Sequence, residues 1–463
     1  MTTDELIYTP ATALAQAIRE KKVSSEEVVN AYRARVEAVN PALNAVVQLN
    51  PEAGAQARRA DEALARGEYV GPLHGVPFTV KEAFEVAGLA SSGGTLGRKS
   101  FTAQQDATAV ARLRAAGGIV LGVTNTPELS LSFESDNLVY GRTNNPYDLT
   151  RTPGGSTGGE AAIIAAGGSP LGLAGDYAGS IRIPAHFCGI AGLRPTVGRI
   201  SRAGYFPPMG AARGLMAQPG PLARYVADLA LMLPLIVGPD GRDHTVIPML
   251  VRDSASVDLK RLRIAYYTDN GIMPVTPETV AAVKTAAQVL REAGATVTED
   301  RPPGVEQTLE LFLGLNASDG GAGVQRVLQM AGTETLHPAT QAFLETIKPM
   351  AKTAAEFTGL WFRWDMWRNT ILGFMEKYDV VLCPVSATPA MPHGTTGRAL
   401  PAFSYAMTYT LTASPGVVVR ASTSSEGLPI GIQIVPHHWR EDVALAVAQY
   451  IEGALGGWQR PPL

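Results

Sequence analysis

Cysteine is scarce in this sequence: of 463 residues only Cys188 and Cys383 are cysteines, and both lie in apolar stretches. Two distant cysteines with apolar neighbours are typical of free, buried thiols in a reducing compartment. The histidines show no HExxH-type spacing, and the cysteines form no CxxC pair. The sequence therefore predicts no disulfide framework, no metal site and no cofactor.

Charge is also sparse and nearly balanced. Charged residues make up 17% of the chain and the formal net charge is −3, so no basic surface for nucleic acid is expected. The longest apolar run, Val226 to Val237, contains Asp228 and Pro234 and is too short to span a membrane. The N-terminal MTTDELIYTP lacks the basic and apolar regions of a signal peptide. We expect a cytoplasmic protein with no nucleic-acid or membrane partner; a homodimer is left open.

Strand-like apolar segments alternate with helical ones along the chain. Val76–Val80 is predicted to be a buried strand that ends at Lys81, and Ser24 with Glu27 forms a capping box at a helix start. Further strands are expected at Gly118–Val123, Leu262–Tyr267, Val380–Pro384 and Ile430–Ile434, and further helices at 106–116, Val226–Val237, Pro277–Ala293 and about 441–455. This alternation predicts an α/β fold with a sheet covered on both faces. Since no linker or repeat interrupts it, one domain is expected.

One glycine-rich run invites comparison with two other classes of enzyme, and both comparisons are disfavoured. Gly154–Gly158 fits the GxSxG elbow of α/β-hydrolases, which must follow a strand. The preceding residues, 148–153, are polar and end in proline, which makes a strand improbable there. The same glycine run lacks the Gly-Lys-Ser/Thr of a phosphate-binding loop.

The region between residues 140 and 200 carries a more specific pattern. Its core is Pro153-Gly154-Gly155-Ser156-Thr157-Gly158-Gly159-Glu160, followed by Gly175-Asp176-Tyr177-Ala178-Gly179-Ser180-Ile181-Arg182-Ile183-Pro184-Ala185. Accompanying blocks lie at Leu73–Glu82, Gly189–Thr196, Gly220–Arg224 and Gly427–Gln433. In this order the blocks resemble the amidase signature family, which includes bacterial amidases, fatty acid amide hydrolases and the amidotransferase subunit that makes Gln-tRNA. The resemblance extends over most of the chain.

The resemblance implies the amidase signature fold, an α/β/α sandwich around a central mixed, largely parallel sheet. It implies a single amidase domain over residues 1–463, with a catalytic core at about 65–240 and a more variable specificity segment at about 300–375.

The resemblance also assigns roles to individual residues. Ser180 is expected to be the nucleophile, Ser156 the bridging serine with an unusual cis peptide bond, and Lys81 the base. The backbone amides of Tyr177, Ala178, Gly179 and Ser180 are expected to form the oxyanion hole. Thr157, Asp176 and Arg182 are expected to support the site through hydrogen bonds.

These residue types are chemically sufficient without a histidine. A serine hydroxyl is a weak nucleophile until a base takes its proton, and a desolvated lysine loses its own proton readily enough to serve. The apolar strand before Lys81 favours such desolvation. Ser156 can accept a proton from Ser180 and pass one to Lys81.

The sequence departs from the common family pattern at three positions. Thr157 replaces the second serine of the Gly-Gly-Ser-Ser-Gly-Gly run but keeps a hydroxyl. Ala178 replaces a glycine in the oxyanion loop, which adds a methyl group and keeps the amide. Glu82 follows Lys81 where an aspartate is common, so the polar support of the base is less defined. None of these changes removes a reacting group.

Three segments outside the signature are candidates for substrate selection. Trp361, Phe362, Trp364 and Trp367 form an aromatic stripe, for which core packing is favoured over a substrate-binding wall. Tyr205–Met209 is a candidate pocket rim. Gly314–Gly323, within residues 310–325, has the composition of a mobile loop and is a candidate lid.

These observations favour a serine amidohydrolase that cleaves carboxamides through an acyl-enzyme. Aryl or hydrophobic amides are the favoured substrates, and esters and carbamates (urethanes) share the reacting carbonyl. The alternative is the amidotransferase subunit of a tRNA-dependent complex that forms Gln or Asn. A non-catalytic scaffold of the same fold is disfavoured because Lys81, Ser156 and Ser180 are all present.

Overall fold

The computed structural model describes residues 2–208 and 210–463, and within these ranges eleven strands form one sheet. The strand order is β1-β3-β2-β4-β6-β5-β10-β11-β9-β7-β8. The strands are β1 Val46–Leu49, β2 Pro77–Lys81, β3 Ile119–Thr124, β4 Leu171–Asp176, β5 Ala191–Arg194, β6 Gln218–Ala223, β7 Arg263–Tyr266, β8 Thr296–Glu299, β9 Val380–Pro384, β10 Gly416–Thr423 and β11 Pro429–Pro436.

The sheet is mixed. β2 runs parallel to both β3 and β4, and β7 runs parallel to both β8 and β9. The strands between these two blocks, and β1 at one edge, pair in antiparallel fashion. Because β2 and β4 are parallel neighbours, their carboxyl ends, at Lys81 and Asp176, reach the same edge of the sheet.

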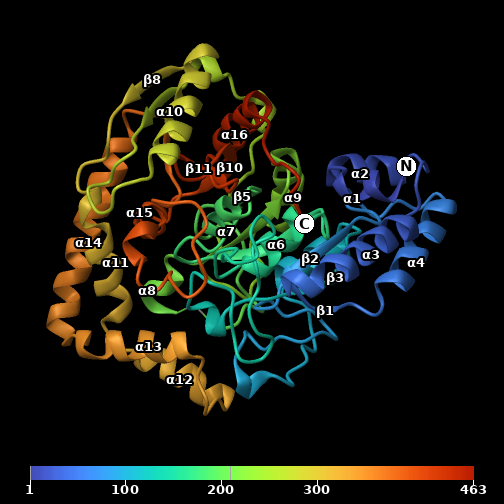
Figure 1. Ribbon diagram of the computed structural model, residues 1–463, viewed down its shortest axis with the longest axis horizontal. Helices are drawn as coiled ribbons and strands as arrows, with labels where there is room; N and C mark the ends of the chain where they lie inside the picture. Colours follow the sequence, from blue (N-terminus) through green and yellow to red (C-terminus); the bar gives the residue numbers. More distant parts are fainter. Residues whose placement is uncertain (1, 209) are drawn as a thin grey trace.

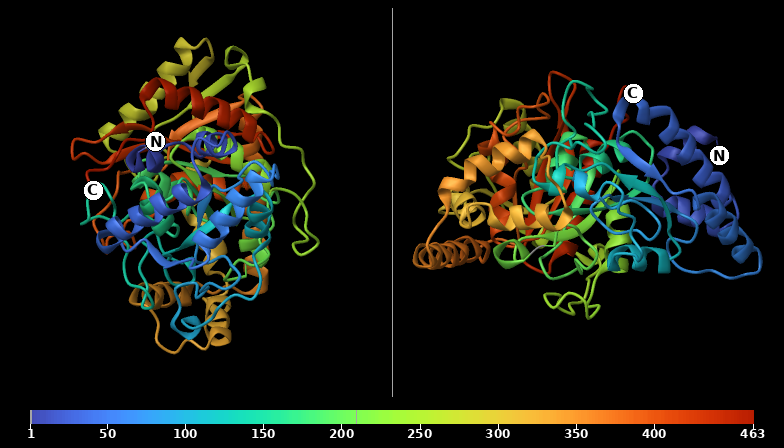
Figure 2. Two further views of the ribbon diagram at one scale, coloured as in Figure 1. Left: turned by 90° about the vertical axis from the view of Figure 1, so that its right-hand side faces the viewer. Right: turned by 90° about the horizontal axis from the view of Figure 1, so that it is seen from below.

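Helices cover the sheet, as Figures 1 and 2 show. They are α1 Thr3–Tyr8, α2 Ala11–Arg19, α3 Ser25–Leu43, α4 Ala53–Ala65, α5 Thr108–Ala115, α6 Gly158–Ala165, α7 Arg182–Phe187, α8 Ala211–Gly214, α9 Val226–Ile236, α10 Pro277–Glu292, α11 Thr308–Ala317, α12 Ala322–Ala331, α13 Pro338–Ile347, α14 Ala354–Met375, α15 Ser404–Leu411 and α16 Glu441–Leu455. The capping box predicted at Ser24 is confirmed at the start of α3.

Two hydrophobic cores lie on opposite faces of the sheet. Successive residues of a strand point to opposite faces, and in β10 Val417 and Val419 belong to one core whereas Val418 belongs to the other. Helices α9, α10 and α16 contribute to the first core, and α7, α14 and α15 to the second. The predicted α/β fold, with a mixed sheet covered on both faces, is confirmed.

The N-terminal helices α1–α4 and the helices α11–α14 lie at opposite sides of the molecule (Figure 1). Both ends of the chain lie on the same side (Figure 2), where Arg460 Nη1 contacts Asp4 Oδ2 at 3.2 Å. In the described part of the chain, no helix has the length and apolar character needed to cross a membrane. Cys188 and Cys383 are free and buried, as predicted.

The expectation of a loop at Gly314–Gly323 is wrong. Gly314 lies inside α11 and Gly323 inside α12, so only a short turn remains between the two helices. A Cβ on Gly314 would lie 3.1 Å from Leu360 Cδ2 of α14. Close packing of two helices therefore accounts for this glycine, and loop flexibility does not.

The aromatic stripe of α14 divides between core and solvent. Trp364 is fully buried and its Nε1 donates to the Leu411 carbonyl at 3.1 Å. Trp367 is also buried and its Nε1 donates to the Gly304 carbonyl at 2.7 Å. Phe362 is 65% exposed. Core packing, the favoured interpretation, is confirmed for Trp364 and Trp367, and the partly buried Trp361 packs against the same core.

Candidate active site

Lys81 is the last residue of β2, and its side chain is completely buried. Its Nζ lies 2.6 Å from Ser156 Oγ and 3.3 Å from the hydroxyl oxygen of Tyr205. Burial disfavours the charged ammonium and lowers the pKa of Lys81 to about 7, although the charge of Asp176 acts in the opposite direction. An amine with this pKa is a base at neutral pH.

Ser156 lies in the turn that leads into α6, and it follows Gly155 through a cis peptide bond. The backbone of residues 132–134 passes so close that a Cβ on Gly155 would be 2.5 Å from the Ser132 carbonyl oxygen. Only glycine fits there. Thr126 Oγ1 donates to the Ser156 carbonyl at 2.9 Å. These contacts hold Ser156 with its hydroxyl against Lys81.

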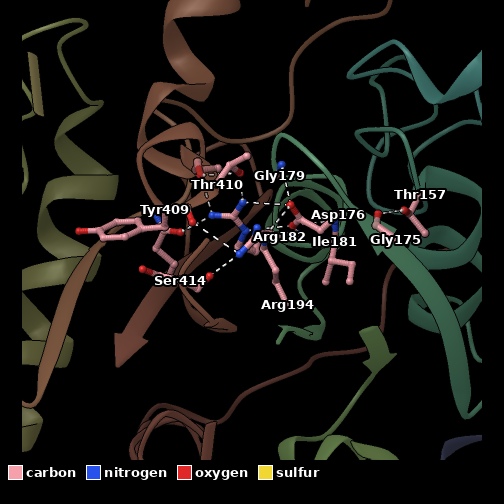
Figure 3. Close-up of polar contacts among 12 residues, drawn as sticks. Thr157, Gly175, Asp176, Gly179, Ile181, Arg182, Arg194, Tyr409, Thr410 and Ser414 are labelled. Atoms are coloured by element: carbon pink, nitrogen blue, oxygen red, sulfur yellow. Dashed lines mark hydrogen bonds and ion pairs between the residues drawn. The ribbon is translucent and has the colours of Figure 1, made fainter. Parts of the chain in front are cut away.

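Ser180 lies in the loop between β4 and α7, and only 6% of its surface is exposed. Asp176, the last residue of β4, organises this loop. Its Oδ1 accepts a hydrogen bond from the Gly179 amide at 2.9 Å, and its Oδ2 accepts one from the Ile181 amide at 3.2 Å. Figure 3 shows the carboxylate at the centre of these contacts. The nucleophile predicted from the sequence is therefore positioned by a side chain four residues before it.

Two buried arginines neutralise Asp176. Arg182 Nε lies 2.9 Å from Oδ2, and Arg194 Nε lies 3.3 Å from Oδ1 (Figure 3). Burial opposes ionisation of Asp176, but the two guanidinium groups outweigh it, so the pKa of this carboxyl lies below its ordinary value. Arg182 also donates to the Ala406 carbonyl at 2.7 Å and to Thr410 Oγ1 at 2.8 Å. The loop is thereby tied to α15.

The four amides expected to form the oxyanion hole are not equivalent. The Gly179 amide is already engaged by Asp176, so it is not free for a substrate oxygen. Within the described residues, the N–H groups of Tyr177, Ala178 and Ser180 have no hydrogen-bond partner. These three amides remain for the predicted hole.

The remaining expectations are met to different degrees. Thr157 Oγ1 donates to the Gly175 carbonyl at 3.3 Å and so links the Ser156 turn to β4. No hydrogen bond joins Ser156 and Ser180 in the described structure. Glu82 does not contact Lys81; its carboxylate accepts hydrogen bonds from the Gly93 amide at 2.8 Å and from Tyr140 at 2.9 Å.

Three further polar residues have contacts at the site that the sequence analysis does not predict. Tyr205, a candidate for the pocket rim, contacts Lys81. Glu160 is buried beneath β2 and β3, where it accepts hydrogen bonds from Thr79 and Thr124, and burial raises its pKa to about 8. Arg194, a charged residue at the end of an apolar strand, could have been recognised as a buried ion-pair partner. The rest of the rim segment is Phe206, Pro207 and Pro208; Met209 lies outside the described residues.

Two aromatic pairs begin at residues next to Ser156 and Ser180. Phe133, whose backbone lies against Gly155, stacks on Phe403 with ring centres 4.1 Å apart. Tyr177 packs against Phe312 of α11 with ring centres 6.0 Å apart. Across residues 2–208 and 210–463 no group of three or more His, Cys, Asp or Glu side chains is arranged to hold a metal ion.

Comparisons with known proteins agree with the resemblance seen in the sequence. A family model described as Amidase matches residues 27–445. The chain is 34% identical to fatty-acid amide hydrolase 2-A of Danio rerio, with 99% of this chain and 91% of that protein covered. It is also 34% identical to an acylamidase of Rhodococcus erythropolis, with 99% and 98% covered. A glutamyl-tRNA(Gln) amidotransferase subunit of Bdellovibrio bacteriovorus matches at 32%, with 97% and 98% covered.

The fold is shared with solved amide hydrolases. The structure of 6-aminohexanoate cyclic dimer hydrolase complexed with substrate superposes with a TM-score of 0.87 at 28% sequence identity. The match covers 98% of this chain and 99% of that chain.

The buried Asp176 pair leads to a prediction about stability. Asp176→Asn leaves Arg182 and Arg194 without a counter-charge, which typically costs about 3–5 kcal/mol. We expect a correspondingly lower denaturation midpoint by circular dichroism. The control is Asp148→Asn, because Asp148 is partly exposed and contacts Arg151 at 3.2 Å; it should cost less than about 1 kcal/mol. Equal, small effects of both substitutions would contradict the central role of Asp176.

Proposed function

Because this chain belongs to the amidase signature family, we propose that it is a serine amidohydrolase that cleaves carboxamides with Ser180, Ser156 and Lys81. The observation that carries the proposal is the buried 2.6 Å contact between Lys81 Nζ and Ser156 Oγ, with the pKa of Lys81 lowered to about 7. Such a pair can remove a proton from a third hydroxyl without a histidine.

The proposed reaction has two halves. Ser180 Oγ attacks the substrate carbonyl carbon; its proton passes to Ser156 Oγ, and the Ser156 proton passes to Lys81 Nζ. The ammonium then returns a proton through Ser156 to the leaving nitrogen, the C–N bond breaks, and an ester on Ser180 remains. Water attacks this ester with its proton following the same route, and the acid is released.

The proposed oxyanion hole consists of the amides of Tyr177, Ala178 and Ser180. The Gly179 amide acts indirectly, because its bond to Asp176 Oδ1 holds the loop in shape. Donors fixed before the substrate arrives stabilise the negative oxygen without reorganising, and each typically contributes about 3–4 kcal/mol.

We propose hydrophobic or aryl amides as the substrate class. The support is two aromatic pairs beside the site: Phe133 stacks on Phe403, and Tyr177 packs against Phe312. The names of two relatives, a fatty-acid amide hydrolase and an acylamidase, point in the same direction. The contact from Phe312 also supports the division of a single domain into a catalytic core at about 65–240 and a specificity segment at about 300–375. Esters and carbamates share the reacting carbonyl and belong to the proposed range.

The second candidate is an amidotransferase subunit. It is favoured by the match to a glutamyl-tRNA(Gln) amidotransferase subunit over nearly the whole of both chains. A protein of that kind would be isolated with partner chains and would release ammonia from glutamine. The purified single chain would then cleave aryl amides poorly.

The proposed function is tested by the release of 4-nitroaniline from an acyl 4-nitroanilide and from the matched N-(4-nitrophenyl) carbamate. We expect the wild-type chain to cleave the anilide and Ser180→Ala to be inactive, because it lacks the nucleophile. Ser256→Ala, a change of an exposed serine, should keep the wild-type rate. Undiminished hydrolysis by Ser180→Ala would refute the proposal; ammonia release from glutamine together with inert anilide would favour the amidotransferase.

The pKa of Lys81 predicts the pH dependence of hydrolysis. Only the uncharged amine can accept a proton, so kcat/KM should fall as the pH drops through about 7 and reach a plateau above it. Lys81→Ala should abolish this limb and slow the reaction by about a hundredfold or more. A rate that still rises steeply above pH 9 would mean that Lys81 keeps an ordinary pKa.

A further inference from the structure

A chain of hydroxyl groups connects Lys81 to the backbone of Ser156 by a second route. Lys81 Nζ lies 3.3 Å from the Tyr205 hydroxyl oxygen, which lies 3.4 Å from Ser130 Oγ. Ser130 Oγ lies 3.3 Å from Thr126 Oγ1, and Thr126 Oγ1 lies 2.9 Å from the Ser156 carbonyl oxygen. Together with the direct contact between Lys81 and Ser156, these four contacts close a ring.

The carbonyl oxygen at the end of this chain fixes the direction of every hydrogen bond in it. A carbonyl only accepts, so Thr126 must donate to Ser156. Each hydroxyl has one proton; Thr126 therefore accepts from Ser130, and Ser130 accepts from Tyr205. The Tyr205 proton is thereby committed to Ser130, and its oxygen can only accept from Lys81.

This direction matters because an uncharged amine has two protons and one lone pair. If Tyr205 donated to Lys81, it would occupy the lone pair that must take the Ser156 proton. With Tyr205 as acceptor, one N–H of Lys81 points to Tyr205 and the lone pair is left for Ser156 Oγ, 2.6 Å away.

We propose that Tyr205, Ser130 and Thr126 form a directional hydrogen-bond relay that positions Lys81 and aims its lone pair at Ser156. The proposal rests on the proposed function, and it makes Tyr205 and Ser130 positioning residues: they act through Lys81 and do not touch the reacting carbonyl.

The backbone around Ser130 supports the relay. Leu129 and Ser130 adopt positive φ angles of 51° and 58°, a conformation that is uncommon for non-glycine residues and carries a cost. Leu129 is buried in a cluster with Leu328 of α12 and Leu344 of α13. The packing of these helices therefore holds Ser130 where its hydroxyl meets Tyr205.

The acidic side chains near Lys81 do not compete with the relay. Asp176 is held by Arg182 and Arg194. Glu82 accepts from the Gly93 amide and Tyr140, and Glu160 accepts from Thr79 and Thr124. The partners of the Lys81 amine within the described structure are thus two hydroxyls, those of Ser156 and Tyr205.

The relay is tested with a fluorophosphonate probe, which phosphonylates an activated serine with loss of fluoride and requires no knowledge of the natural substrate. The second-order rate constant is measured against pH for the wild type, Tyr205→Phe, Ser130→Ala and the double variant. Tyr205→Phe should lower the plateau rate about tenfold, because the amine is no longer oriented. It should also move the acid limb to lower pH by about 0.7, because the phenol oxygen stabilises the ammonium more than the amine.

Ser130→Ala tests whether the direction of the Tyr205 hydrogen bond, and not only the packing of its ring, affects the rate. Without Ser130 the Tyr205 proton is free to turn to the Lys81 lone pair, so the plateau rate should fall several-fold. In the Tyr205→Phe background the same change should have no further effect. Tyr225→Phe is the matched control. It removes a hydrogen bond from the Tyr225 hydroxyl to the Tyr8 carbonyl at 3.1 Å, outside the relay, and it should react as the wild type.

The outcomes separate the relay from the proposed function. If wild-type Ser180 is not labelled, the proposed function fails. If Ser180 is labelled and Tyr205→Phe keeps both the rate and the pH profile, only the relay fails. Strictly additive losses in the double variant would also overturn it, because they would show two independent packing effects.

Discussion

The amine of Lys81 is buried, and among the residues that the structure describes no carboxylate contacts it; the organisation of the site follows from this constraint. An ammonium ion removed from water costs several kcal/mol unless an opposite charge compensates it. Burial without such a partner accordingly lowers the pKa of Lys81 to about 7. In the proposed mechanism this residue, ordinarily a cation, serves as the base; its partners within the described structure are hydroxyl groups.

The acidic residues around Lys81 are consistent with this arrangement because each is engaged elsewhere. Asp176 lies at the same sheet edge as Lys81, yet Arg182 and Arg194 hold it. Asp176 therefore holds the Ser180 loop through the amides of Gly179 and Ile181. It does not contact Lys81 directly, so it forms no ion pair that would stabilise the ammonium. Glu82 and Glu160, close to Lys81 in the chain or the sheet, bind amides and hydroxyls in the same way. Because Arg182 and Arg194 pair with Asp176, this carboxylate can hold the Ser180 loop in shape without forming an ion pair with Lys81.

Much of this arrangement could be predicted from the sequence where the signal is local. The apolar run before Lys81 predicts β2, whereas the assignment of Ser156 and Ser180 comes from the resemblance of two glycine-rich blocks to the amidase signature. Contacts between distant segments left no such signal. Tyr205 contacts Lys81 across 124 positions, and the sequence, which does not show this contact, predicts only a place at a pocket rim for Tyr205. Gly314 suggested a loop because composition does not reveal that Leu360 packs against it. The engagement of the Gly179 amide by Asp176 depends on loop geometry, which residue identity does not specify.

The most direct test of the account is a measurement of the charge on Lys81 itself. Lysine labelled with ¹³C at Cε would be followed by NMR against pH, and the Lys81 resonance assigned by its loss in Lys81→Arg. We expect one resonance that titrates with a midpoint near 7, well below the ordinary lysine value of 10.5. A Lys81 resonance that titrates with the surface lysines would show that the amine is charged at neutral pH, and it would contradict both its role as the base and the relay built around it.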